Sequence, residues 1–230
     1  MEGYMKVFCW DFDGTLSFSN PLWTGSVFDA LKTVMPQIDD SFFSEIRVFM
    51  QYGFPWHTPD VDYTFCKGNK WWKFMEKHFC ESYIKCGIDP EIAQTAAKLV
   101  RSIIKQKSRY TLYNDAVDTL QIIKEQGAIN VLMSNNYPDL GDILKQLGLS
   151  QYFDEVILSA VIGYNKPHRK FFDSVKSKYP NAEFYMIGDN INADILGGKQ
   201  NGMTTVLVHK GFSEYADYCF DELKEVLSLL

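Results

Sequence analysis

The sequence predicts an α/β fold with a mainly parallel sheet, interrupted by an all-helical insertion. Beyond about residue 109, short apolar runs alternate with amphipathic helical patterns, as in parallel strands joined by right-handed crossovers. Another apolar run of strand length, at residues 7–10, stands alone near the N-terminus. Residues 22–107 lie between these parts and show helical spacing broken by turns, with no convincing strand. The sheet is therefore expected to contain strands from both sides of a helical insertion.

The N-terminal strand ends in two acidic residues. Val7–Trp10 is an apolar run that predicts a buried strand, and Asp11 and Asp13 follow it directly. Gly14 has the backbone freedom to turn the chain out of the sheet, and the Thr15 hydroxyl can tie that turn. Open α/β sheets bind ligands at the carboxyl ends of their strands, so the two acids are candidate site residues. The alternative is that they form an acidic, solvated exit from the strand.

The insertion is expected to form a helical domain at residues 18–108. Its helical patterns are centred on Val27–Val34, Phe42–Met50, Trp71–Ile84 and Pro90–Ile103. Asp89 and Pro90 are typical of an N-cap and a first helical position. A loop at 52–60 contains two prolines and a glycine, and its Trp56 and His57 are candidates to reach over a site and set substrate specificity. The alternative for His57 is a satisfied or merely exposed side chain.

The rest of the chain predicts alternating strands and helices. The expected strands are Ile129–Met133, Val156–Leu158, Glu183–Ile187 and Thr204–Val208. The expected helices are about Ala116–Ile123, Leu140–Leu147, Phe171–Lys178, Ala193–Asn201 and Asp221–Leu230. Gly127 and Gly148 follow two of these helices, where C-capping glycines are common. Together with the first strand, these elements predict a discontinuous α/β domain made of residues 1–17 and 109–230.

The composition is that of a soluble globular protein. The chain has 230 residues, of which 46% are hydrophobic and 23% charged, and its net charge is −6. An acidic chain without a run of Lys or Arg is not expected to have nucleic acid or an anionic membrane as its main partner. The five cysteines form no C-x-x-C pair, and the N-terminus has no signal-peptide pattern. We therefore expect a cytoplasmic protein with reduced thiols and no zinc site.

Polar residues follow three of the predicted strands, and a parallel sheet brings such strand ends to one edge. They are Asp11 and Asp13 after the first strand, Ser134 and Asn135 after the second, and Asp189 after a later one. Lys166, in a loop before a proline, is a further candidate. A lone Ser-Asn after a strand is usually a turn or a helix N-cap, and a lone Gly-Asp is a similarly weak signal. Carboxylates from separate strands repel each other unless a cation lies between them, and Mg²⁺ prefers oxygen ligands completed by water or phosphate. The set therefore predicts a magnesium and phosphate site, with Ser134, the Asn135 amide and Lys166 on the phosphoryl oxygens.

Four segments of the chain resemble the motifs of the haloacid dehalogenase-like (HAD) hydrolase superfamily, in the family's order and at plausible spacing. They are Asp11–Thr15, Ser134-Asn135, Lys166-Pro167 and Gly188–Asp194. The resemblance covers the α/β part of the chain. It implies a Rossmann-like core whose first strand leads into a tight turn and a flap, with the helical domain at 18–108 inserted in that flap as a cap.

The resemblance implies a magnesium-dependent phosphatase that acts on a small phosphorylated metabolite through an aspartyl-phosphate. Asp11 would be the nucleophile, Asp13 the general acid and then the general base, and Lys166 would offset charge between nucleophile and phosphate. The phosphate contacts would come from Gly14, Thr15, Ser134, Asn135 and Lys166. The Mg²⁺ ligands would be the Asp11 and Asp189 carboxylates, the Asp13 backbone carbonyl, and Asp194 either directly or through water.

Two other functions fit the same motifs. A phosphomutase or phosphotransferase shares all four and differs by cap residues that reseat the intermediate, and we recognise no such cap signature. A catalytically silent binding module would be expected to have lost part of the acidic set, which is intact here. The dehalogenase branch of the family lacks the acid that Asp13 represents, because carbon–halogen cleavage needs no proton for its leaving group.

Overall fold

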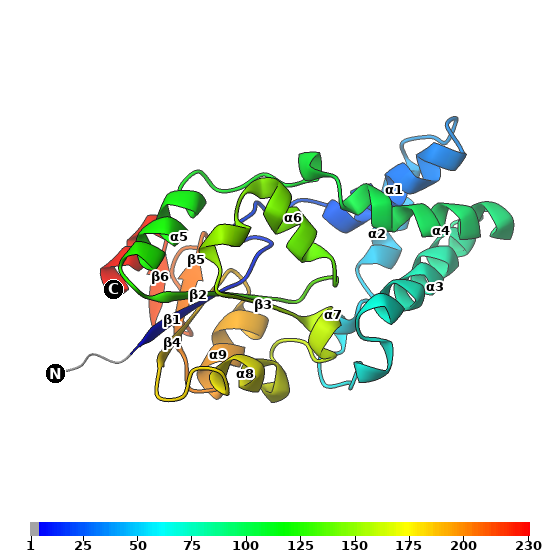
Figure 1. The fold of residues 1–230 in the computed structure, drawn as a ribbon. Helices are drawn as coiled ribbons and strands as arrows, with labels where there is room; N and C mark the ends of the chain where they lie inside the picture. The colour runs from blue at the N-terminus through cyan, green and yellow to red at the C-terminus, as the bar shows by residue number, and fades with distance from the viewer. Residues whose placement is uncertain (1–4) are drawn as a thin grey trace.

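The computed structural model describes residues 5–230 and contains a six-stranded, all-parallel sheet in the order β3-β2-β1-β4-β5-β6 (Figure 1). The strands are β1 (Lys6–Trp10), β2 (Ile129–Ser134), β3 (Glu155–Leu158), β4 (Glu183–Gly188), β5 (Thr204–Val208) and β6 (Tyr218–Phe220). One face of the sheet is covered by α5 (Ala116–Glu125) and α6 (Leu140–Leu147), and the other by α8 (Arg169–Lys176) and α9 (Gly197–Gln200). This three-layer, Rossmann-like arrangement confirms the predicted fold class.

The strand register brings the carboxyl ends of β1, β2 and β4 to one edge. Trp10, the last residue of β1, pairs with Leu132 of β2 on one side and Ile187 of β4 on the other. The backbone of Asp11 stays attached to the sheet, because its N–H donates to the Ile187 carbonyl at 2.9 Å. The residues that follow these three strands are therefore neighbours in space, as parallel pairing requires.

Residues 22–104, all of which the structure describes, form a block of helices and turns without a strand. We call this segment the helical block; its α-helices are α1 (Leu22–Val34), α2 (Phe42–Met50), α3 (Asn69–Lys85) and α4 (Pro90–Ile104). As expected, Asp89 caps α4, since its side chain accepts from the N–H groups of Glu91 and Ile92. The Pro-rich loop contains two short 3₁₀ turns, Pro55–His57 and Thr64–Cys66.

The helical block leaves and rejoins the α/β part through two connections that lie side by side. The Phe18 N–H donates to the Thr111 carbonyl at 2.8 Å, and Ser17 forms an antiparallel bridge with Leu112. Further along, Asp139 at the start of α6 accepts from the Trp72 indole at 3.0 Å and from the Arg101 guanidinium at 2.8 Å. The helical block is thus joined to the start of α6 in the α/β part. The division between the two parts at residues 17/18 and 108/109 stays a prediction.

The chain after β4 differs from the expected pattern in three ways. The helix expected at 193–201 begins earlier, as a π-helical turn (Ile191–Leu196) that runs into α9, because the Asn190 side chain caps its first N–H groups. The strand β6 was not predicted, since it has only three residues and is half-buried. The tail is a 3₁₀ helix (Leu223–Leu229) that begins with a capping box between Glu222 and Glu225, and not an amphipathic α-helix.

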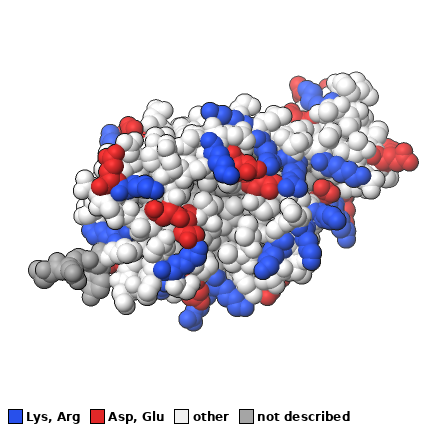
Figure 2. All heavy atoms as spheres, viewed as in Figure 1, with Lys and Arg blue, Asp and Glu red and all other residues white. Residues whose placement is uncertain are grey.

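Charged side chains of both signs are spread over the surface. On the face shown in Figure 2, Lys and Arg lie interspersed with Asp and Glu over both the sheet region and the helical block. Within residues 5–230, no helix combines the length and apolar character that a membrane crossing needs.

Asn130 connects the sheet to its neighbouring helices through a fully satisfied, buried amide. Its Oδ1 accepts from the Trp10 indole at 3.0 Å, and its Nδ2 donates to the carbonyls of Leu120 (2.9 Å) and Tyr152 (3.2 Å). Asn130→Leu would leave these buried partners unpaired, so we expect it to lower the free energy of unfolding by about 3 kcal/mol in urea titrations. Asn69→Ala, at an exposed position, is the control; a loss for Asn130→Leu no larger than that of the control would contradict this account.

Candidate active site

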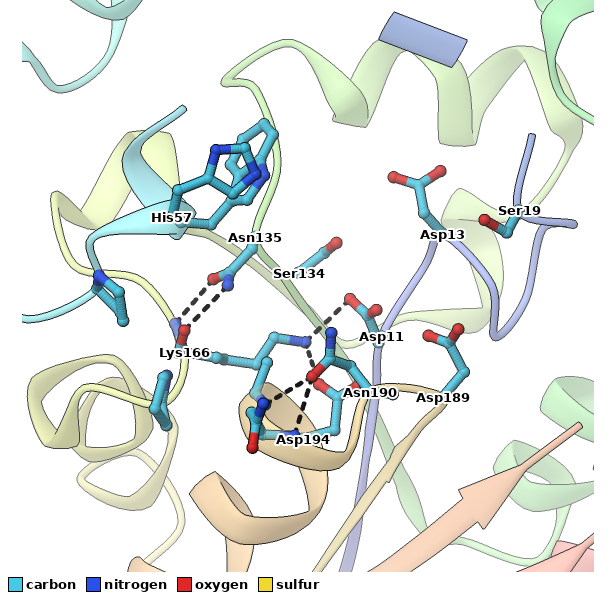
Figure 3. A pocket seen from close by; sticks show the side chains of 15 residues that line it. Asp11, Asp13, Ser19, His57, Ser134, Asn135, Lys166, Asp189, Asn190 and Asp194 are labelled. Carbon is cyan, nitrogen blue, oxygen red and sulfur yellow. Dashed lines mark hydrogen bonds and ion pairs between the residues drawn. The ribbon is translucent and has the colours of Figure 1, made fainter. Parts of the chain in front are cut away.

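A polar pocket of about 570 Å³ lies at the carboxyl edge of the sheet, between the strand ends and the helical block (Figure 3). It brings together most of the residues singled out in the sequence: Asp11, Asp13, Ser134, Asn135, Lys166, Asp189, Asp194, Trp56 and His57 all line it. These residues come from five separate segments of the chain. Their convergence follows from the parallel register and from the loop of the helical block that carries Trp56 and His57.

The turn after β1 places two acids in different surroundings. Asp11 continues the line of the strand, whereas Asp13 lies on the turn and accepts a hydrogen bond from Asn136 Nδ2 at 2.8 Å. Burial, and then the nearby charge of Asp11, raise the pKa of Asp13 to about 7, although the Asn136 hydrogen bond acts in the opposite direction. An acid in this environment can hold a proton near neutral pH. Its neighbour Asp11 is instead ion-paired to Lys166.

Lys166 is buried and forms three short contacts with its ammonium group. Its Nζ lies 2.6 Å from Asp194 Oδ1, 2.7 Å from the Met133 carbonyl and 2.9 Å from Asp11 Oδ1. Burial alone would lower the pKa of Lys166, but the two carboxylates outweigh it and the net shift is upward. An ammonium has three donors, and here all three are used. Lys166 therefore acts on its surroundings through its charge.

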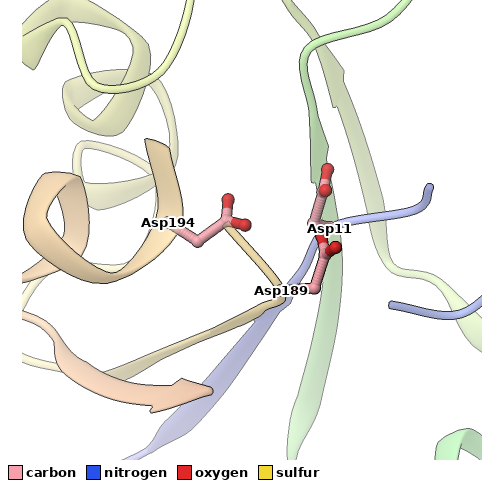
Figure 4. A group of neighbouring side chains, drawn as sticks. All are labelled: Asp11, Asp189 and Asp194. Atoms are coloured by element: carbon pink, nitrogen blue, oxygen red, sulfur yellow. The ribbon is translucent and has the colours of Figure 1, made fainter. Parts of the chain in front are cut away.

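Asp11, Asp189 and Asp194 form an acidic cluster in which one carboxylate oxygen from each lies within 4.8 Å of the others (Figure 4). Close packing against glycine makes this possible: a Cβ on Gly14 would lie 2.3 Å from Asp189 Oδ2, and one on Gly188 would lie 2.1 Å from Asp194 Oδ2. Gly14 also has φ of +83°, which favours glycine. Burial and the Asp11 charge raise the pKa of Asp189, so the carboxylates are held together against their repulsion.

This cluster has the donor set that a divalent magnesium ion prefers. All three groups offer hard carboxylate oxygens, and Lys166 neutralises only one of the negative charges of its two partners. Lys210 makes a further contact with Asp189 Oδ2 at 3.3 Å, from a position that is half exposed. Both oxygens of Asp194 already accept hydrogen bonds, from Lys166 and from the Asn190 N–H. The residues present therefore fit Mg²⁺, with Asp11 and Asp189 the least engaged ligands.

The loop after β2 holds the lysine loop in place. The Asn135 side chain accepts from the Lys166 N–H at 2.8 Å and donates to the Lys166 carbonyl at 3.1 Å, so it faces the lysine backbone. Ser134 is buried and lines the pocket. The sequence reasoning missed Asn136, which is buried and bonded to Asp13. Asn136 could have been proposed as a site residue from the sequence, because it directly follows Ser134 and Asn135.

The expected phosphate contacts of Gly14 and Thr15 stay a prediction. Neither residue lines the pocket, and the Gly14 N–H donates to the Ser17 carbonyl and the Thr15 N–H to the Phe12 carbonyl. Both amides are thus consumed within the turn itself. Gly14 serves the site in another way, by leaving room for the Asp189 carboxylate.

The loop of the helical block reaches the pocket through the 3₁₀ turn Pro55–His57. Trp56 stacks on Phe54 with a ring separation of 4.5 Å and an interplanar angle of 13°. His57 lies on the pocket side opposite Asp11 and Asp13 (Figure 3), and partial burial lowers its pKa. The structure therefore places both residues at the same pocket as the strand-end acids.

Comparison with known proteins gives one family match and several relatives. The family model for haloacid dehalogenase-like hydrolases matches residues 5–202. A phosphoserine phosphatase of Thermus thermophilus is 30% identical over 60% of this chain and 55% of its own length. A glyceraldehyde 3-phosphate phosphatase of Pyrococcus furiosus is 25% identical over 98% of this chain and 93% of its own. The aligned region thus spans about half of the first relative and most of the second.

Solved structures share the fold at low sequence identity. The HAD-hydrolase YfnB of Bacillus subtilis, a structure bound to magnesium, superposes with a TM-score of 0.73 at 18% identity and covers 99% of both chains. A HAD phosphatase of Thermococcus onnurineus gives a TM-score of 0.65 at 23% identity, over 98% of this chain and 97% of its own. The L-2-haloacid dehalogenase of Xanthobacter autotrophicus gives 0.67 at 19% identity, over 98% of both chains. These likenesses support the fold.

The buried ion cluster makes a testable prediction about stability. Lys166→Met removes the cation between Asp11 and Asp194, so in EDTA at neutral pH we expect the free energy of unfolding to fall by about 3 kcal/mol. Adding Asp194→Asn should restore part of that loss, because it removes one uncompensated charge. Lys170→Met, on an exposed lysine, is the control. Equal stability of the Lys166 and Lys170 variants would contradict the assignment of Lys166 as the central counter-charge.

Proposed function

The chain belongs to the haloacid dehalogenase-like hydrolases, and we propose that within this family it is a magnesium-dependent phosphatase. In this proposal it hydrolyses a small phosphorylated metabolite through an aspartyl-phosphate intermediate. The similarity to proteins named phosphoserine phosphatase and glyceraldehyde 3-phosphate phosphatase supports phosphate ester hydrolysis. We also propose that residues 1–17 and 109–230 form the catalytic core and residues 18–108 a cap over its pocket.

The separation of Asp11 from Asp13 carries the proposal. Asp11 belongs to the acidic cluster and is ion-paired to Lys166, and its carboxylate lines the pocket. Asp13 lies outside that cluster, on the turn, and is held by Asn136. Phosphoester cleavage needs both a nucleophile and an acid for the leaving alcohol, whereas carbon–halogen cleavage needs no such acid. The pair therefore favours a phosphatase over a dehalogenase.

In the first step, a carboxylate oxygen of Asp11 attacks the phosphorus atom and forms a new P–O bond. The bond between phosphorus and the substrate alcohol breaks, and Asp13 gives its proton to the departing oxygen. Ser134 and the Asn135 amide would hold the phosphoryl oxygens, and Lys166 would keep Asp11 oriented while offsetting negative charge.

In the second step, Asp13, now deprotonated, removes a proton from a water molecule. The water oxygen attacks phosphorus, the bond to Asp11 breaks, and inorganic phosphate leaves with the Asp11 carboxylate regenerated. Because Asp13 regains the proton that it lost, the protein returns to its starting state. A phosphomutase would instead transfer the phosphoryl group to a second substrate hydroxyl.

Mg²⁺ would be held by Asp11, Asp189 and the Asp13 backbone carbonyl, with Asp194 directly or through water. When bound, the ion supplies positive charge to the phosphoryl oxygens and relieves the repulsion among the carboxylates. The residues of the chain still do the orienting: Gly14 and Gly188 leave space for the acids, and Lys166 fixes Asp11 relative to Asp194.

The proposal predicts metal-dependent hydrolysis that requires Asp11. Release of phosphate from a generic aryl phosphate should occur with Mg²⁺, stop with EDTA, and fall by at least about 10³-fold in Asp11→Asn. The measurement is phosphate release at fixed protein concentration, with folding of each variant checked by circular dichroism. An unchanged rate in EDTA or in Asp11→Asn would refute the metal or the nucleophile, and absence of turnover on any phosphate ester would favour a silent binding module.

A further inference from the structure

Apart from the four acids and Lys166, no Asp, Glu, Lys or Arg lines the pocket among the described residues. We define the neutral wall of the pocket as Ser19, Trp56, His57, Pro59 and Asn192. Among the described residues that line the pocket, Lys166 is the only Lys or Arg. Its three donors are already taken by Asp11, Asp194 and the Met133 carbonyl. A substrate held against the neutral wall therefore meets no side-chain cation beyond the phosphate site.

Trp56 and His57 offer hydrogen bonds that the protein does not use. Elsewhere in the chain, the indole N–H groups of Trp10 and Trp72 are bonded to Asn130 and Asp139. For Trp56 and His57, no hydrogen-bond partner of the ring nitrogens lies among residues 5–230. The Trp56 ring is fixed by stacking on Phe54 and Trp71 and by its contact with Trp23, so it is held rigidly at the pocket with an unpaired donor. Such a surface suits C–H and hydroxyl or carbonyl groups.

Lys210, Lys170 and Arg47 do not line the pocket. Lys210 contacts Asp189, and Lys170 is bonded to the Tyr164 hydroxyl at 2.8 Å. Arg47 lines a separate hollow of about 400 Å³ that shares only Ser19 with the pocket. Partial burial lowers the pKa of His57, which disfavours the charged form of its imidazole. A second anionic group on the substrate would therefore add to the charge of the acids without a counter-charge.

We infer that the substrate is a phosphate monoester of an uncharged alcohol, such as a polyol or sugar, whose carbon face packs on Trp56 and whose oxygens bond to Trp56 and His57. Phosphate esters whose leaving group carries a carboxylate are disfavoured by the same wall. This inference rests on the proposed phosphatase activity and specifies its substrate class.

A matched pair of esters tests it. Glycerol 3-phosphate and 3-phosphoglycerate have the same carbon skeleton and differ by a hydroxymethyl against a carboxylate. We expect kcat/KM with Mg²⁺ to be at least about tenfold higher for glycerol 3-phosphate. An aryl phosphate measured alongside reports the proposed function separately: no hydrolysis of the aryl phosphate or of either glycerol ester would contradict that function. Normal aryl phosphate hydrolysis with equal or better use of 3-phosphoglycerate would overturn only the inference about the wall.

Variants of His57 assign the preference to the neutral wall. His57→Arg supplies a cation and should shift the kcat/KM ratio toward 3-phosphoglycerate by about tenfold, whereas His57→Gln keeps the wall neutral and should preserve the ratio. Gln94→Arg adds the same charge at an exposed site on α4 and controls for net charge. The same shift in Gln94→Arg, or none in His57→Arg, would overturn the assignment. So would a preference for 3-phosphoglycerate that Arg47→Gln abolishes.

Discussion

The ion cluster of Lys166 with Asp11 and Asp194 is the interaction on which the rest of the site depends. Its lysine comes from the loop after α7 (Ser159–Ile162), one acid from the end of β1, and the other from the π-helical turn after β4. Buried charges are costly unless they are paired and hydrogen-bonded. The three segments must therefore meet closely, and the parallel register, the small residues Gly14 and Gly188, and the Asn135 clamp on the lysine backbone all serve that meeting.

The same constraint explains why two neighbouring acids differ chemically. Asp11 is ion-paired to the lysine and joins the acidic cluster, whereas Asp13 lies on the turn in a half-buried position where its partner is the neutral amide of Asn136. A charged partner would hold Asp13 ionised, and a neutral amide does so much less. The sequence Asp-Phe-Asp thus yields a nucleophile and a proton carrier because only one of its acids reaches the cation.

Much of the fold and of the candidate site could be predicted from the sequence, because the motifs that indicate them are short and local. The apolar runs ending in Asp11, Ser134 and Asp189 gave the strands and their shared edge, and the cap of α4 by Asp89 follows from residue type. The misses depended on tertiary contacts. The short strand β6 exists because β5 offers it an edge to pair with, which residue types alone do not reveal. The hydrogen bond from Asn136 to Asp13 could not be predicted, because it depends on the direction in which the turn points the Asp13 side chain.

The most direct test of the account is whether Asp11 becomes phosphorylated during turnover. The protein would be mixed with Mg²⁺ and a substrate ester, quenched in acid within one turnover, digested, and analysed by mass spectrometry. The account predicts a phosphoryl group on the peptide that contains Asp11, absent in Asp11→Asn, with Asp13 unmodified. Phosphate release with no acyl phosphate on Asp11, or a phosphoryl group on another residue, would contradict the central claim that Lys166 and the acidic cluster prepare Asp11 as the nucleophile.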